Sequence, residues 1–126
     1  MHLINLENKK VLVVEDDDMS YLYLNQLLIL TKGTIVREKN GIDAIEQFRN
    51  NRGYDLVLMD IQLPDMDGKQ VTREIRILDA EIPIIAQTAS RSALEKELAL
   101  EAGCTAIITK PFTMEELFGV IGKYLG

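Results

Sequence analysis

The sequence of 126 residues has one cysteine, three prolines and no long apolar run. A single cysteine, Cys104, excludes an internal disulfide and is typical of proteins in a reducing cytoplasm. No segment is long and apolar enough to cross a bilayer. The start, MHLINLENKK, lacks the basic residues and following apolar run of a signal peptide. We therefore expect a cytoplasmic location and no membrane contact by this domain.

Basic residues are also few relative to acidic ones, with 14 Lys and Arg against 20 Asp and Glu, for a net charge of −6. This balance argues against a general nucleic-acid binder, so no direct nucleic-acid contact is expected. The length suits one domain. With no repeat, low-complexity tract or internal linker, we predict a loosely held N-terminal arm over residues 1–8 and one domain over residues 9–126.

Short β-branched or apolar runs alternate with longer stretches of helical character. This alternation predicts an α/β domain with a doubly wound, five-stranded parallel sheet and five helices, because continuous apolar strands need cover on both faces. The strands are expected at 10–15, 34–38, 55–60, 83–87 and 105–109, and the helices at 19–32, 41–51, 69–79, 92–102 and 113–125.

Local chemistry supports these boundaries. Thr113 with Glu116, and Ser92 with Glu95, have the spacing of a capping box. Asp18 is predicted as the N-cap of the first helix. Three glycines lie where helices are expected to end: Gly33, Gly53 and Gly103.

Polar side chains follow the strands at their carboxyl ends, where ligands bind in parallel sheets. The first strand ends on Glu15 and Asp16, the third on Asp60, the fourth on Gln87 and Thr88, and the fifth on Thr109 and Lys110. All of these groups should therefore meet at one edge of the sheet.

Three close carboxylates repel one another unless a cation is bound, and Mg²⁺ prefers oxygen ligands of this kind. An ammonium and a hydroxyl opposite them would supply a charge and a hydrogen bond to a phosphoryl group. We therefore interpret Asp60 as a nucleophile, with Mg²⁺ as cofactor and with Thr88 and Lys110 as its catalytic partners.

Four motifs, VLVVEDD (11–17), LVLMDIQLPDMDG (56–68), QTA (87–89) and TKPF (109–112), occur in the order and spacing of a known family. With them, residues 10–125 resemble the receiver domains of two-component response regulators, typified by the bacterial chemotaxis regulator. The segments AQTA and EAGCTAIITKPF are similar to receivers attached to hybrid histidine kinases.

The resemblance implies a flavodoxin-like fold with strand order 2-1-3-4-5. It also implies that Asp60 accepts a phosphoryl group from a histidine kinase or a histidine phosphotransfer domain, and that the chain has no separate enzymatic turnover. Asp16, Asp60 and the backbone carbonyl of Gln62 would bind Mg²⁺, with Glu15 assisting through water. Thr88 and Lys110 would be the switch hydroxyl and the phosphate-binding lysine. No output domain follows Leu125, so the output partner is unknown and the chain either works alone or comes from a larger protein.

Two positions depart from the family pattern. Glu15 stands where an aspartate is common, which keeps the charge and lengthens the side chain. Ile107 stands where many relatives carry Tyr or Phe, so the aromatic half of the usual switch is absent. The resemblance further implies a cis peptide bond between Lys110 and Pro111.

Two other functions stay open from sequence alone. A haloacid-dehalogenase-like phosphatase also uses an aspartyl nucleophile, Mg²⁺, Thr and Lys, but it needs a second Asp where this chain has Gln62, and it needs a cap domain. A phosphorylation-independent binding module would usually lack an acid or the lysine, and none is missing here. Several residues have structural interpretations: Asp65 and Asp67 as loop formers, Cys104 as a small core residue and His2 as inert.

Overall fold

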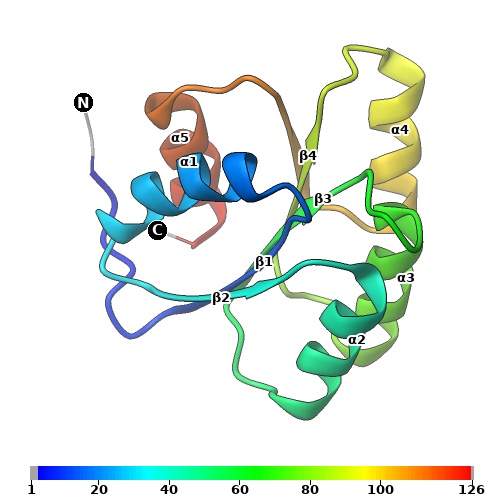
Figure 1. Ribbon diagram of the computed structural model, residues 1–126, viewed down its shortest axis with the longest axis horizontal. Coiled ribbons are helices and arrows are strands. Elements are labelled where there is room, and N and C mark those ends of the chain that lie inside the picture. The colour runs from blue at the N-terminus through cyan, green and yellow to red at the C-terminus, as the bar shows by residue number, and fades with distance from the viewer. Residues whose placement is uncertain (1–2, 126) are drawn as a thin grey trace.

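The computed structural model describes residues 3–125. Its five strands are all parallel and form one sheet of order β2-β1-β3-β4-β5 (Figure 1). The predicted strand order is therefore confirmed. The strands are β1 (Lys10–Val14), β2 (Thr34–Glu38), β3 (Leu56–Asp60), β4 (Ile84–Thr88) and β5 (Ala106–Thr109).

Helices cover both faces of the sheet, as the apolar strands predict. Figure 1 shows α1 (Asp18–Ile29) and α5 (Met114–Leu125) on one face. The other face carries α2 (Gly41–Asn50), α3 (Gly68–Leu78) and α4 (Ala93–Ala102). None of these helices, within residues 3–125, is long and apolar enough to span a membrane.

The central strands are buried because each one contributes side chains to two apolar cores. Along β1, Val11 and Val13 pack in the core beneath α1 and α5, whereas Leu12 and Val14 pack in the core beneath α2 to α4. This division follows from the two-residue repeat of a strand, which points successive side chains to opposite faces. The polar residues at the strand ends are thereby held by a rigid, doubly covered sheet.

Helix α1 and its N-cap each begin one residue earlier than expected. Asp17, and not Asp18, is the N-cap: its backbone is extended, and its Oδ2 accepts the N–H of Ser20 at 2.8 Å. Asp18 is the first helical residue and pairs instead with Arg37 at 2.9 Å. The prediction was wrong because three consecutive aspartates offer equivalent caps, and only the turn of the chain decides which one faces the helix.

The two expected capping boxes differ. Between Thr113 and Glu116 the box is complete, with bonds of 3.2 and 3.1 Å in the two directions. Ser92 accepts the N–H of Glu95 at 3.4 Å, but the Glu95 carboxylate lies 3.7 Å from Lys69. Only half of the second box forms.

Gly103 ends a helix as predicted: it is the C-cap of α4 and has a φ of 118°. This backbone conformation is strained for residues other than glycine. After α1, however, the positive φ of 67° falls on Lys32 and not on Gly33.

The N-terminal segment is held more firmly than expected. Leu6 is fully buried in the core beneath α1 and α5, and its N–H donates to the carbonyl of Thr31 at 2.7 Å. The prediction of a loosely held arm is therefore wrong at Leu6, because an apolar side chain there completes the core. The domain boundary at residue 9 stays a prediction, and His2 lies outside the described residues.

Candidate functional site

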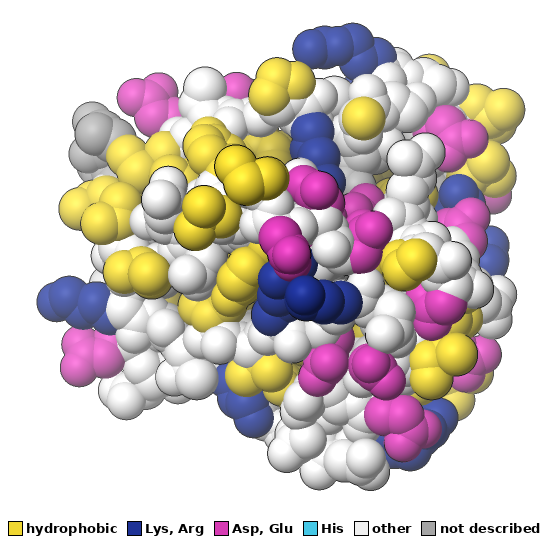
Figure 2. Space-filling model, viewed as in Figure 1, with side chains coloured by type: hydrophobic (Ala, Val, Ile, Leu, Met, Phe, Trp, Pro, Cys, Tyr) yellow, Lys and Arg dark blue, Asp and Glu magenta, His cyan; other side chains and the backbone are white. Residues whose placement is uncertain are grey.

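Acidic side chains from two strand ends meet at the carboxyl edge of the sheet. Glu15, Asp16 and Asp60 each place one carboxylate oxygen within 4.8 Å of the others. Glu15 is 1% exposed and Asp60 7%, whereas Asp16 is exposed. In Figure 2, acidic and basic side chains gather near the middle of this face. The predicted convergence of these three acids is present.

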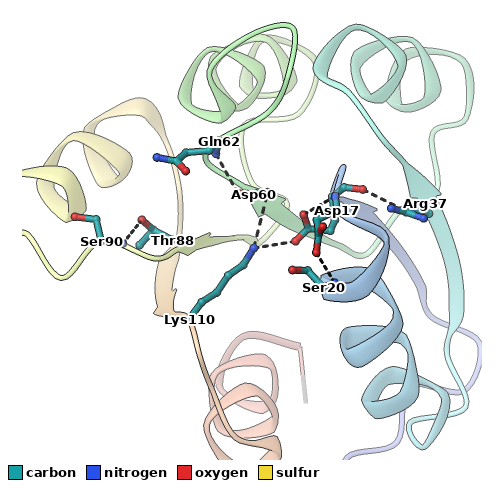
Figure 3. A network of polar contacts seen from close by, with 9 residues as sticks. Asp17, Ser20, Arg37, Asp60, Gln62, Thr88, Ser90 and Lys110 are labelled. Atoms are coloured by element: carbon teal, nitrogen blue, oxygen red, sulfur yellow. Dashed lines mark hydrogen bonds and ion pairs between the residues drawn. The ribbon is translucent and has the colours of Figure 1, made fainter.

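Lys110 reaches into this acidic cluster from the loop after β5 (Figure 3). Its Nζ donates to Oε1 of Glu15 at 2.9 Å and lies 3.6 Å from Oδ2 of Asp60. The Lys110–Pro111 bond is cis, as predicted. Burial alone would lower the pKa of Lys110, but its contacts with Glu15 and Asp60 outweigh this effect and raise the pKa. The lysine is therefore a permanent counter-ion of the cluster.

Asp60 has a strongly perturbed carboxyl group. Its burial and its contact with Glu15 raise the pKa to about 7, although the Lys110 ammonium and a hydrogen bond from the N–H of Gln62, 3.0 Å to Oδ1, act in the opposite direction. Without a bound cation, the carboxyl group therefore keeps its proton to a much higher pH than an ordinary aspartate does. A cation at this edge would compete with that proton.

The backbone beyond Asp60 is packed tightly against α3. A Cβ at Gly68 would lie 2.2 Å from the carbonyl oxygen of Asp60, so only glycine permits this approach. The N–H of Gly68 also donates to the carbonyl of Ile61 at 2.8 Å. The first turn of α3 therefore fixes the position of Asp60.

The two other aspartates of this loop cap helices. Asp67 is the N-cap of α3 and accepts the N–H of Lys69 at 2.8 Å. Asp65 accepts the N–H groups of Gly41 and Ile42, at 2.8 and 2.9 Å, from the start of α2. Their interpretation as loop formers is confirmed, and Asp65 also ties the loop to a second helix.

Thr88 ends β4 at the same edge, but its hydroxyl group faces the following loop. Oγ1 of Thr88 accepts the N–H of Ser90 at 3.0 Å, and the Thr88 carbonyl accepts the N–H of Lys110 at 2.8 Å. Figure 3 shows the Thr88 side chain directed to Ser90, apart from the contact between Lys110 and Asp60. Its expected role as a switch hydroxyl stays a prediction.

Two residues at this edge were given no role from the sequence. Arg37 on β2 donates from Nε to the carbonyl of Glu15 at 3.0 Å. Gln87 on β4, the register partner of Asp60, is 1% exposed, and its Nε2 has no hydrogen-bond partner among the described residues. For Gln87 the sequence signal was a polar side chain after three apolar residues of a strand, whereas Arg37 lies in the mixed strand TIVRE and gave no such signal.

The donor set fits Mg²⁺, which takes about six oxygen ligands and keeps several waters. Asp16 is exposed, and Asp60 offers Oδ2, whose contact with Lys110 is long at 3.6 Å. Glu15 is engaged on both oxygens, by Lys110 at 2.9 Å and by the N–H of Asp17 at 3.2 Å. Asp16 and Asp60 therefore suit direct coordination, and Glu15 suits contact through water.

These features define a receiver domain. The family described as response regulator receiver domain matches residues 11–122, so the chain belongs to this family and is a signalling module of two-component systems. Membership in this family disfavours the phosphatase alternative.

Particular relatives share nearly the whole domain. The polar-differentiation response regulator DivK of Brucella anthropi is 35% identical over 120 residues, which cover 94% of this chain and 97% of DivK. The receiver domain of the sensor histidine kinase PA1611 from Pseudomonas aeruginosa PAO1 has a magnesium ion coordinated in its active-site cleft. It is 32% identical, with a TM-score of 0.85 over 93% of this chain and 97% of that chain.

A third similar structure is the co-crystal of the Saccharomyces cerevisiae histidine phosphotransfer signalling protein Ypd1 with the receiver domain of its downstream response regulator Ssk1. It is 29% identical, with a TM-score of 0.86 over 94% of this chain and 90% of that chain. Other curated relatives are much longer, and the matched region makes up 20%, 13% and 18% of three of them. The same domain therefore occurs both alone and within larger proteins.

Proposed function

We propose that this receiver domain accepts a phosphoryl group on Asp60, in the presence of Mg²⁺, from a phosphohistidine on a partner protein. One observation carries the proposal: Asp60, Glu15 and Asp16 converge at one edge, and Lys110 contacts two of these acids. Such a site is costly without a cation, because like charges lie together in a partly buried place. It becomes favourable when a metal and a phosphoryl group are bound.

The transfer breaks the N–P bond of the donor histidine and forms an O–P bond to Asp60. The histidine nitrogen keeps the electron pair of the broken bond, and Asp60 must be ionised to attack. Bound Mg²⁺ would neutralise charge between the carboxylates and the phosphoryl oxygens. Asp16, Asp60 and the carbonyl of Gln62 would hold the ion, with Glu15 acting through water.

Lys110 would contact the phosphoryl group through its ammonium. Its ammonium already lies between Glu15 and Asp60, so a short movement would bring it to a phosphoryl oxygen. The Thr88 hydroxyl would leave Ser90 and donate to another oxygen of the phosphoryl group. By this chemistry, the domain catalyses its own phosphorylation and dephosphorylation but turns over no separate substrate.

The donor is expected to be a histidine kinase or a histidine phosphotransfer protein that docks beside Asp60. Met19, Leu22 and Tyr23 of α1 are 72%, 48% and 44% exposed, and Figure 2 shows exposed hydrophobic side chains over α1. A cavity of about 630 Å³ lies between this helix, the end of β4 and the loop after β5. An apolar helix face next to the acceptor suits a partner protein that carries the histidine. A similar receiver domain, that of Ssk1, forms a complex with the histidine phosphotransfer protein Ypd1. Such a pathway and the single, buried Cys104 are consistent with a cytoplasmic location.

Intact-mass measurement with acetyl phosphate and Mg²⁺ tests the acceptor. The wild type should gain one phosphoryl group that hydroxylamine removes, and Asp60→Asn should gain none. Asp55→Asn is the matched control, since Asp55 lies just before β3, at the opposite end of that strand from Asp60. Lys110→Ala should bind Mg²⁺ but lose the conformational response to beryllium fluoride. An unchanged wild-type mass, or phosphorylation of Asp60→Asn, would refute the proposal.

Docking is tested by comparing two donors. Leu22→Asp should take phosphate from acetyl phosphate at the wild-type rate, because Leu22 lies outside the acidic cluster. It should accept phosphate more slowly from phosphorylated Ypd1, used as a heterologous phosphotransfer protein. Equal loss with both donors would place the effect in the site and contradict docking on α1.

A further inference from the structure

One basic side chain ties strand β2 to the segment that carries two of the three clustered acids. Nε of Arg37 donates to the carbonyl of Glu15 at 3.0 Å, and one terminal nitrogen lies 2.9 Å from Oδ1 of Asp18. The guanidinium also lies over the ring of Tyr21, 4.3 Å from its centroid. Arg37 therefore makes three contacts, one with Glu15 before Asp16 and two with Asp18 and Tyr21 of α1 after it. Figure 3 shows Arg37 beside the segment that leads into α1.

These contacts restrict the acidic segment to one arrangement. The N–H of Glu15 donates to the carbonyl of Glu38 at 3.0 Å, so both backbone polar groups of Glu15 are held by neighbouring residues of β2. On its far side the segment is held by the Asp17 cap. Asp16 is exposed and lies between these anchors, so its carboxylate depends on the backbone on either side for its direction.

The charge of Arg37 accounts for its ion pair with Asp18 but would not by itself favour a metal at the acidic cluster. A cation near the acids repels Mg²⁺ and would weaken its binding, whereas a fixed backbone would strengthen it. Lysine could keep the charge, but it lacks the planar guanidinium group, whose Nε donates to Glu15 while its face lies over the Tyr21 ring. The geometry therefore favours a positioning role.

We infer that Arg37 is a positioning residue for Mg²⁺: it orients the backbone of Glu15 and the carboxylate of Asp16 from outside the metal site. The inference rests on the proposed function, in which these acids bind Mg²⁺. Arg37 itself touches neither the metal nor the phosphoryl group.

Arg37→Lys tests the inference because it preserves the charge and removes the fork. Titration of ¹⁵N-labelled protein with MgCl₂, followed by the amide signals of residues 15–18, gives the dissociation constant directly. We expect about a 10-fold weaker Mg²⁺ affinity in Arg37→Lys, the size seen when outer partners of metal ligands are changed. The matched control is Lys39→Gln, since Lys39 pairs with the same Asp18 at 3.2 Å and, within residues 3–125, forms neither a hydrogen bond nor an ion pair with Glu15. Its affinity should stay within about two-fold of the wild type.

A second pair of variants tests the inference without changing Arg37, in case Arg37→Lys fails to fold. Tyr21→Leu removes the ring beneath the guanidinium and should weaken Mg²⁺ binding about three-fold, whereas Tyr21→Phe keeps the ring and should bind as the wild type does. Thermal unfolding in chelator separates affinity from stability, since a merely structural role would lower the melting temperature and leave the affinity of the folded fraction unchanged. Wild-type Mg²⁺ affinity in Arg37→Lys, or in Tyr21→Leu if the first variant fails to fold, would overturn the inference. A wild type that binds no Mg²⁺ would instead refute the proposed function.

Discussion

Replacing Asp60 by Asn should stabilise the metal-free protein, and the gain should depend on pH. The pKa of Asp60 is raised in the folded protein from 3.8 to about 7. Below the lower value both the folded and the unfolded chain hold the proton, so the carboxyl group costs nothing. As the pH rises towards 7, Asp60 loses its proton in the unfolded chain but keeps it in the folded protein. The free energy of unfolding therefore falls.

The size of the effect follows from the same shift. One pKa unit is equivalent to about 1.4 kcal/mol, so the full change sets an upper limit of about 4 kcal/mol above pH 7. Water at the edge of the sheet weakens such interactions, and we expect roughly half of that limit, about 2 kcal/mol. Asn can still accept the N–H of Gln62, and Lys110 keeps its bond to Glu15, so the substitution removes charge without removing these partners.

Urea unfolding of both proteins in chelator, at about pH 5 and about pH 8, measures the effect. The advantage of Asp60→Asn should be larger at the higher pH by about 1 to 2 kcal/mol, because the other titrating groups are shared by the two proteins. Added Mg²⁺ should stabilise the wild type and close the gap, and it should do little for the variant. A gap that is the same at both pH values, or a variant less stable than the wild type at the higher pH, would refute the electrostatic reasoning.

Two further predictions concern the end of β4. Beryllium fluoride should shift the backbone amide signals of residues 89–94 more than those around Ile107, because Ile107 is β-branched and cannot swing as an aromatic ring does. Thr88→Ala should suppress these shifts and Ile107→Val should leave them; a large rearrangement of the Ile107 side chain, with residues 89–94 unchanged, would show the opposite. Gln87→Met should raise the free energy of unfolding by about 1 kcal/mol, because the buried Nε2 has no partner among the described residues. Urea unfolding measures this, and a loss of stability would indicate that the amide is satisfied.

The sheet and the convergence of the acids could be predicted because they depend on periodicity. Apolar strands alternate with helices, parallel strands align their carboxyl ends, and Asp60 must then lie near Glu15. The choice of Asp17 over Asp18 as the cap could not be predicted, because it depends on the direction in which the chain leaves β1. Likewise, Nζ of Lys110 lies closer to Glu15, at 2.9 Å, than to Asp60, at 3.6 Å. A difference this small in side-chain position has no counterpart in the sequence.

The contacts of Arg37 and Asp65 were also beyond the sequence. Both join segments that are more than 20 residues apart, Arg37 to Glu15 and Asp65 to Gly41. No local pattern specifies such pairs, since a strand arginine or a loop aspartate is usually solvated. Their partners are decided by tertiary packing alone.

The close approach of Gly68 to Asp60 limits which helices can move when Asp60 is phosphorylated. Helix α3 begins in contact with the backbone of the acceptor, so its first turn cannot move unless β3 moves with it. Helix α4 follows Thr88 through residues 89–92, mostly exposed, and the hydrogen bonds of Ser90 and Ser92 there are local. The molecule therefore has a stationary side and an adjustable side. A protein that reads the phosphorylated state should bind near α4, whereas one that binds over α3 would meet nearly the same surface in both states.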